Sequence, residues 1–111
     1  MALPARIDRK SHKENVGKRS PAHCNFVRSH NCSVPGCLAR PIEVAHVRRA
    51  FNSGIGVKPS DRWTISLCRD HHSEQHRGDQ TFEAKYGIDC LALSVEFMKA
   101  SPHRIKLETM P

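Results

Sequence analysis

Two pairs of metal-ligating side chains, with thirty residues between them, constrain this chain more than any other feature of its sequence. Cys32 and Cys37 enclose a turn that contains Pro and Gly, and Cys68 and His71 form a Cys-x2-His pair. A structural zinc ion takes four Cys or His ligands in a tetrahedron, so two half-sites of two ligands complete one site. The pattern therefore predicts a structural zinc on these four side chains. The alternative is that they are buried without a metal.

The segment between the half-sites predicts a β-hairpin. Residues 41–49 alternate apolar and polar side chains, which is typical of a strand, and residues 62–68 predict a second strand antiparallel to the first. Residues 50–61 are rich in Gly and Pro and predict the connecting loop. Such a hairpin returns the chain from the first half-site to the second.

Helices are expected after the hairpin, which gives an α+β fold. Residues 69–77 favour a helix that ends at Gly78, residues 81–87 a second short helix, and residues 90–101 an amphipathic helix. The amphipathic face, which belongs either to the core or to a dimer contact, comprises Cys90, Leu91, Leu93, Val95, Phe97 and Met98. Before the hairpin, residues 24–30 predict a short element that Phe26 and Val27 anchor to the core.

Charge and composition divide the chain into an arm, one domain and a tail. Residues 1–31 hold seven basic and two acidic side chains, a formal charge of +5 out of +7 for the whole chain. We expect residues 1–22 to be a basic flexible arm, residues 23–101 the domain, and residues 102–111 a tail. A basic arm suits a polyanion such as nucleic acid, although a solvated tail has the same composition.

The cysteine count and the lack of long apolar runs indicate a reducing compartment. Five cysteines is an odd number, and most lie beside other ligand types, which favours metal binding over disulfides. The N-terminus has no apolar run typical of a signal peptide, and no transmembrane stretch follows it. We therefore expect a cytoplasmic protein.

Three further histidines lie outside the zinc set. His72 and His76 are four residues apart and so share a face of the predicted helix, which His71 does not. The pair predicts a second metal with open coordination positions, as catalysis requires; the alternative is an exposed helix face. His46, on the first strand, is either a general base or a core histidine bonded to a backbone carbonyl.

The composite motif resembles the HNH endonucleases, whose site is a β-hairpin and a helix around a metal (the ββα-metal fold). The stretches "FVRSHNCSVPGC", "EVAHVRR" and "GIGVKPSDRWTISLCRDHHSEQH" resemble a phage and prophage branch that includes the Ref-type recombination nucleases. The resemblance covers roughly residues 23–90. It implies that His46 activates water, that His72 and His76 hold a catalytic metal, and that the four Cys and His ligands hold a bracing zinc.

The chain departs from the family pattern at two positions. Many members carry Asp or His just before the general base, where this chain has Ala45, which cannot bind metal. The central Asn of the motif, which orients the base, falls near Trp63. Asp61 lies close by and is either its substitute or an ordinary turn residue.

These features imply metal-dependent hydrolysis of DNA phosphodiester bonds, with weak sequence specificity or with specificity supplied by a partner. The catalytic metal could be zinc, nickel, manganese or magnesium, and imidazole ligands favour transition metals. Basic side chains that flank the site, and that either clamp the DNA backbone or face solvent, are Arg48, Arg49, Lys58, Arg69 and Arg77. A licensing protein, or homodimerisation through the C-terminal helix, would be compatible with this activity.

Two other function classes remain open from the sequence. A zinc-stabilised DNA-binding module without catalysis needs only the zinc ligands and the positive charge, and it leaves His46, His72 and His76 unexplained. A structural or interaction protein would use the last helix to dock a partner.

Overall fold

A short antiparallel hairpin forms the centre of the protein, of which a computed structural model describes residues 3–4, 18–48 and 59–111. Strand β1 (Ile42–His46) pairs with β2 (Thr64–Cys68), so that Ile42 lies opposite Cys68 and His46 opposite Thr64. Both predicted strands and their antiparallel pairing are confirmed. Most of the connecting loop lies outside the described residues.

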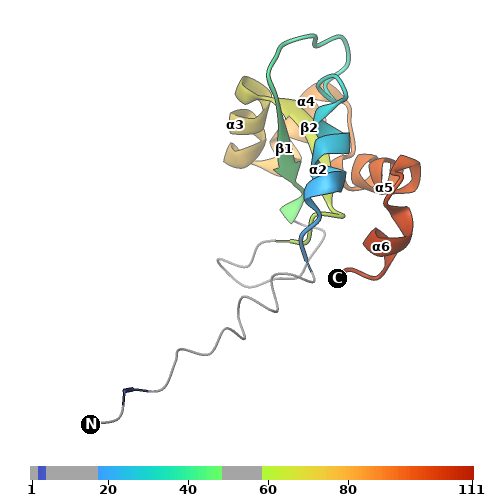
Figure 1. Cartoon of the computed structure of the whole chain (residues 1–111). Helices are drawn as coiled ribbons and strands as arrows, with labels where there is room; N and C mark the ends of the chain where they lie inside the picture. The colour runs from blue at the N-terminus through green and yellow to red at the C-terminus, as the bar shows by residue number, and fades with distance from the viewer. Residues whose placement is uncertain (1–2, 5–17, 49–58) are drawn as a thin grey trace.

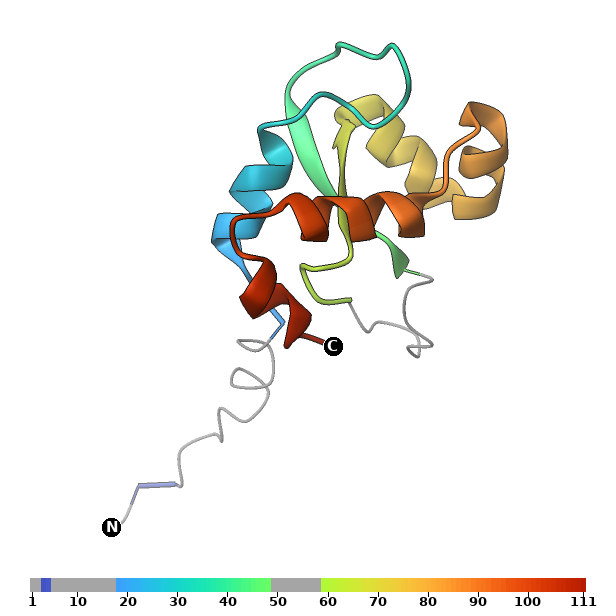
Figure 2. The same ribbon diagram turned by 90° about the vertical axis from the view of Figure 1, so that its right-hand side faces the viewer.

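Helices surround this hairpin on several sides. Helix α2 (Pro21–Arg28) and helix α3 (Arg69–Arg77) lie on opposite sides of the hairpin, and α5 (Cys90–Ala100) runs across it (Figures 1 and 2). Pro occupies the first turn of α2, and the side chain of Ser20 accepts a hydrogen bond from the backbone N–H of His23. The fold is therefore a small mixed α/β domain built around two strands.

Glycines separate the helices that follow the hairpin. Helix α3 begins directly after Cys68 and ends at Gly78, as predicted, and α4 (Asp79–Tyr86) follows at once. Helix α4 ends at Gly87, whose φ of 66° lies in the left-handed region that favours glycine. The connections are short, and α3 and α5 pack against β2 while α4 packs against α3.

The hairpin is more deeply buried than its sequence alternation predicts. All five residues of β2 are buried, and on β1 Ile42 and Ala45 are buried while Val44 is only half-buried. The alternation predicts one solvated face, but helices cover both faces of the hairpin. Polar residues of β2 therefore sit in the core, and Ser66 bonds to the backbone carbonyl of Asn31.

Helix α5 packs into the core, although its innermost line differs from the predicted face. Its buried residues are Cys90, Ser94 and Met98, one helical turn apart. The Ser94 hydroxyl donates to the backbone carbonyl of Leu91, which satisfies a polar group that the sequence did not identify as internal. Of the two predicted anchors on α2, Val27 is buried and Phe26 is half-buried.

Residues beside both expected ends of the domain form helix and pack. In the segment expected as a tail, α6 (Arg104–Glu108) forms, and Leu107 and Met110 are buried against Met98. In the segment expected as an arm, Ser20 is buried and α2 begins at Pro21. The backbone N–H of Ser20 donates to Asp61, which is far away in sequence, whereas Leu107 and Met110 pack on Met98 of the preceding helix.

Among the described residues, no helix combines the length and the apolar character needed to cross a membrane.

Candidate metal centre and histidine site

Three thiols and one imidazole form a compact cluster at the open end of the hairpin. The ligand atoms of Cys32, Cys37, Cys68 and His71 all lie within 4.8 Å of one another. His71 Nδ1 is 3.4 Å from Cys32 Sγ and 3.2 Å from Cys68 Sγ, and Cys37 Sγ is 3.9 Å from Cys68 Sγ. A tetrahedral zinc site has edges of about 3.6 Å between N and S and about 3.8 Å between two S atoms. The cluster therefore has the dimensions of a metal site, and the predicted ligand set is brought together.

Local structure explains why these four side chains meet. A tight turn with Gly36 at φ 78° holds Cys32 close to Cys37, and the backbone N–H of Ser33 donates to the carbonyl of Ser66 on β2. Cys68 ends β2 and His71 lies in the first turn of α3. The ring of His71 packs edge-on against Tyr86, with 5.0 Å between the ring centroids.

The cysteines of the cluster suit a bound cation. Burial raises the pKa of Cys32 to about 11, whereas a hydrogen bond from the Ala39 backbone N–H lowers the pKa of Cys37. A divalent cation would offset the cost of burying a thiolate and would release the thiol protons. Cys32, Cys37 and Cys68 form no disulfide. The cluster could hold a metal such as zinc.

Helix α3 brings two further histidine nitrogens together on another face. His72 Nε2 lies 3.1 Å from His76 Nε2, and their ring centroids are 4.8 Å apart. Two nitrogens that share one ion at about 2.1 Å are about 3.0–3.4 Å apart. Burial lowers the pKa of His76, and the charges of His72 and Arg48 lower it further. A lower pKa favours the neutral imidazole, which is the form that binds metal.

Glu43 is a site residue that the sequence analysis missed. Its carboxylate oxygen Oε1 lies 2.8 Å from Nδ1 of His72. Glu43 is the second residue of β1, where it looks like a solvated strand residue. The signal that could have revealed it is the antiparallel register, which places Glu43 opposite Leu67, near the start of α3.

His46 ends β1 and pairs with Asp61. Nε2 of His46 lies 2.9 Å from Oδ1 of Asp61, as expected if Asp61 orients this histidine. The carboxamide of Gln75 on α3 donates to the backbone carbonyl of His46 at 3.1 Å and ties the strand to the helix.

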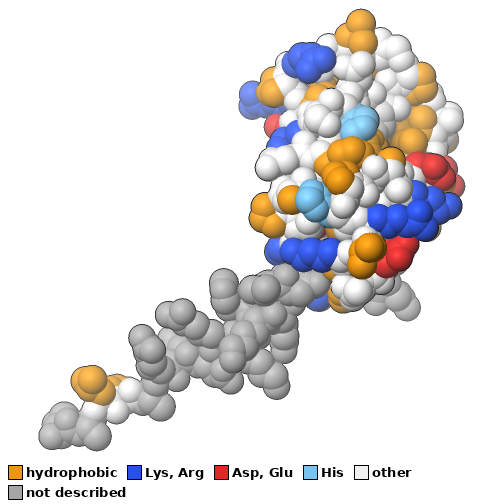
Figure 3. Space-filling view, turned by 45° about the vertical axis from the view of Figure 1, so that its right-hand side comes forward, with side chains coloured by type: hydrophobic (Ala, Val, Ile, Leu, Met, Phe, Trp, Pro, Cys, Tyr) orange, Lys and Arg blue, Asp and Glu red, His pale blue; other side chains and the backbone are white. Residues whose placement is uncertain are grey.

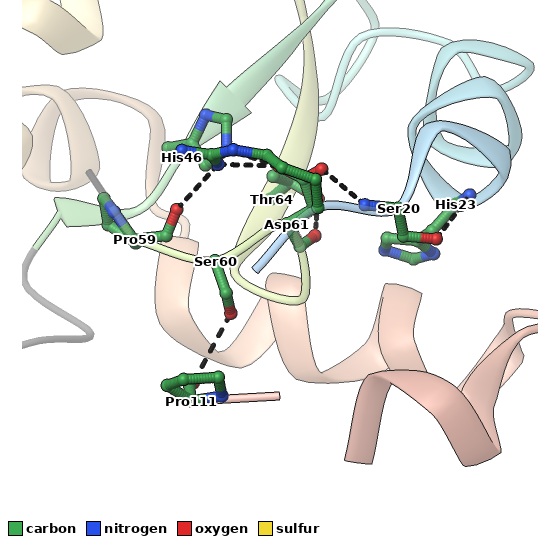
Figure 4. Close-up of polar contacts among 9 residues, drawn as sticks. Ser20, His23, His46, Pro59, Ser60, Asp61, Thr64 and Pro111 are labelled. Carbon is green, nitrogen blue, oxygen red and sulfur yellow. Dashed lines mark hydrogen bonds and ion pairs between the residues drawn. The ribbon is translucent and has the colours of Figure 1, made fainter. Parts of the chain in front are cut away.

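Asp61 itself is held by residues that precede α2. Figure 4 shows the Asp61 side chain between His46 and Ser20. The backbone N–H of Ser20 donates to Oδ2 at 2.8 Å, and Arg19 Nη1 donates to Oδ1 at 3.2 Å. Burial raises the pKa of Asp61, but the contacts with His46, Ser20 and Arg19 outweigh it and hold the pKa well below its usual range. Asp61 is therefore a fixed carboxylate.

A small hollow opens beside the histidine pair. It has a volume of about 110 Å³ and is lined by Arg48, Gln75, His76 and Asp79. Of the other predicted DNA contacts, Arg69 and Arg77 are exposed on α3, whereas Arg49 and Lys58 lie outside the described residues. Ala45 is fully buried and offers no ligand to this site.

Comparison with known proteins gives a family without a described activity. A family model described as "Protein of unknown function (DUF968)" matches residues 10–103. The uncharacterized protein YdfU of Escherichia coli strain K12 is 32% identical over 66 residues, which cover 59% of this chain and 18% of YdfU. The match thus spans less than a fifth of that relative's length. No solved structure matches the chain.

Proposed function

Because the chain belongs to the DUF968 family of proteins of unknown function, its activity must be inferred from its own side chains, and we propose that it is a metal-dependent HNH-type endonuclease that hydrolyses DNA phosphodiester bonds. One observation carries this proposal. A hairpin runs directly into a helix. The hairpin carries His46, which is bound to a carboxylate, and the helix carries His72 and His76, whose Nε2 atoms are 3.1 Å apart.

His46 is the proposed general base. Asp61 is ionised and can only accept hydrogen bonds, so the Nε2 atom of His46 that faces it carries a proton. Nδ1 of the neutral imidazole then holds the lone pair that can take a proton from water. The fixed carboxylate of Asp61 stabilises the imidazolium that results, which favours attack of the deprotonated water on phosphorus.

His72 and His76 are the proposed ligands of the catalytic metal. A divalent ion bound there would offset negative charge that develops on the scissile phosphate and on the leaving 3′ oxygen. Imidazole ligands favour zinc, nickel or manganese over magnesium. Because the described residues around this pair supply only two nitrogen ligands, phosphate oxygens and water would complete the coordination.

The Cys and His cluster is the proposed structural zinc site. Its four ligands join the turn before β1, the end of β2 and the first turn of α3. These are the elements that carry His46, His72 and His76 or lead into them. In this proposal the zinc fixes the scaffold and has no free position for substrate.

DNA would be bound mainly through its phosphates. Arg48 and Arg77 are exposed near the histidine pair, and the N-terminal region carries most of the formal charge. Figure 3 shows the side of the protein that carries α5 and α6, where the Lys and Arg side chains form separate groups among hydrophobic and acidic side chains. Contacts of basic side chains with phosphates would give salt-dependent binding with weak sequence specificity.

A zinc-stabilised DNA-binding module without catalysis is the second candidate. The observation that favours it is that the thiolate cluster has a full set of four ligands, whereas among the described residues no third ligand joins His72 and His76. The resemblance to phage HNH nucleases, which includes the Ref-type branch, favours the catalytic proposal.

The deciding experiment is a plasmid-nicking assay of the wild type and His46→Ala in Mg²⁺, Mn²⁺, Ni²⁺ and Zn²⁺. We expect His46→Ala to cut about 10²–10⁴ times more slowly, because a general base contributes a factor of that size. Its DNA affinity and zinc content should equal those of the wild type. His103→Ala, which removes a histidine beside α6, is the matched control and should cut normally. A wild type that nicks no DNA in any of these metals would favour the binding module.

A further inference from the structure

The contact between Glu43 and His72 extends the proposed metal site. We propose that Glu43 is a positioning residue that fixes the ring orientation and the tautomer of His72, so that its Nε2 atom is available to a divalent cation. The inference rests on the proposed function, because it concerns the second metal site of that proposal. The stretch "EVAHVRR" begins at Glu43, but the sequence analysis assigns this residue no role.

The geometry of the His72 ring separates the two contacts. Nδ1 faces the Glu43 carboxylate at 2.8 Å, and Nε2 faces Nε2 of His76 at 3.1 Å. A carboxylate accepts hydrogen bonds, so the imidazole nitrogen that faces it carries the proton. In a neutral imidazole the other nitrogen then has the lone pair, which here is the nitrogen next to His76. The carboxylate therefore selects the tautomer that a metal needs at Nε2.

Glu43 is better placed to orient the ligand His72 than to bind the metal itself. Its carboxylate contacts the edge of the His72 ring that points away from His76. Metal-binding histidines almost always donate their second ring N–H to a carboxylate, a carbonyl or a water molecule, and this partner fixes the ring and raises its basicity. Glu43 has this relation to His72, and it does not replace the ligand that is lost at Ala45.

The contact depends on the strand register. Glu43 lies opposite Leu67, one residue before the end of β2, and α3 begins just after that end. The side chain of Glu43 is 42% exposed and that of His72 is 20% exposed. At this exposure the ion pair alone contributes little stability. The contact is thus suited to orientation rather than to holding the fold together.

The test measures metal affinity, which does not depend on nuclease activity. Zinc-loaded wild type, Glu43→Ala, Glu43→Gln and His72→Ala are titrated with Ni²⁺ by calorimetry. We expect Glu43→Ala to bind Ni²⁺ about 10–100 times more weakly, as for the loss of comparable partners of ligating histidines. Glu43→Gln should recover part of the affinity, because its amide oxygen can accept the same N–H. Glu96→Ala removes an exposed carboxylate from α5 and should bind as the wild type does.

The outcomes distinguish this inference from the proposed function. Weaker Ni²⁺ binding by Glu43→Ala, with zinc content and far-UV circular dichroism unchanged, supports the positioning role even if no variant cuts DNA. If the enzyme does cut, saturating Ni²⁺ should restore the rate of Glu43→Ala. Wild-type Ni²⁺ affinity in Glu43→Ala would overturn the inference while the nuclease proposal stood. If Glu43→Ala does not fold, Glu43→Gln is the deciding variant, and a loss of Ni²⁺ affinity as large as that of His72→Ala would overturn the inference. A His72→Ala variant that binds Ni²⁺ like the wild type would also overturn it.

Discussion

Adjacent histidines on α3 point to different partners. His71 Nδ1 lies against the sulfurs of Cys32 and Cys68, whereas His72 contacts Glu43 and His76. Successive helical residues are separated by about 100° around the helix axis, so neighbouring side chains leave in different directions. One short helix can therefore supply both clusters, as the spacing in the sequence predicts.

The pair formed by His46 and Asp61 gives a prediction at the residue scale. We expect Asp61→Asn to lower the nicking rate by at least about tenfold, because the amide cannot stabilise the imidazolium of His46 as a carboxylate does. It should also lower the free energy of unfolding by about 1–3 kcal/mol, because the buried N–H of Ser20 and the half-buried guanidinium of Arg19 lose a charged acceptor. Urea denaturation and the nicking assay measure the two effects.

The same variant has an expected pH signature. The pKa of Asp61 is lower in the folded state than in the unfolded state, so unfolding takes up a proton at low pH. The ionised carboxylate therefore stabilises the folded state fully only above its unfolded pKa of about 4. Wild-type stability should fall as the pH drops below about 4, and Asp61→Asn should show a flatter decline. The control is Glu96→Gln on α5. Parallel acid curves for wild type and Asp61→Asn would contradict the depressed pKa.

At the scale of elements, the junction of β2 and α3 organises the site. Cys68 is the last residue of β2 and precedes the first residue of α3, and its thiol belongs to the metal cluster. A metal bound there would tie the turn before β1 to the start of α3. The direction of α3, which carries the second histidine pair, then depends on this cluster.

Removing one ligand at this junction should therefore disrupt the fold. We expect Cys68→Ser to lose its bound metal and most of its far-UV helical signal, because zinc binding contributes about 10–16 kcal/mol in small metal-dependent domains. Native mass spectrometry and circular dichroism measure the two changes. Cys24→Ser, a half-buried cysteine outside the cluster, should keep both the metal and the fold. A folded Cys68→Ser variant without metal would show that the cluster is not structural.

At the scale of the whole molecule, two segments far apart in sequence meet at the turn that carries Asp61. The backbone carbonyl of Lys18 accepts a hydrogen bond from the N–H of Asp61 at 2.8 Å. At the other end, the carbonyl of Pro111 accepts from Trp63 Nε1 at 2.7 Å and that of Met110 accepts from Arg62 Nη1 at 3.0 Å. Segments expected to lie outside the domain therefore hold the partner of His46.

The packing of α6 gives a prediction at this scale. Leu107→Ala should lower the free energy of unfolding by about 2–5 kcal/mol, because it leaves a cavity beside Met98 and Met110. Ile105→Ala, on the same helix but 85% exposed, should change it by less than about 0.5 kcal/mol. Chemical denaturation measures both variants. Equal small effects would show that α6 is not part of the cooperative fold.

The sequence by itself determined the features that depend on local spacing. The cluster of three Cys and one His, the hairpin, and the helix that ends at Gly78 follow from residue types a few positions apart, because turns and helices fix which neighbours share a face. The roles of His46, His72 and His76 remain predictions. Only the tertiary structure decided the contacts of Glu43 with His72 and of Asp61 with Ser20, and the burial of Ser94. These depend on strand register and helix packing, which bring together residues whose separation in sequence carries no periodic signal.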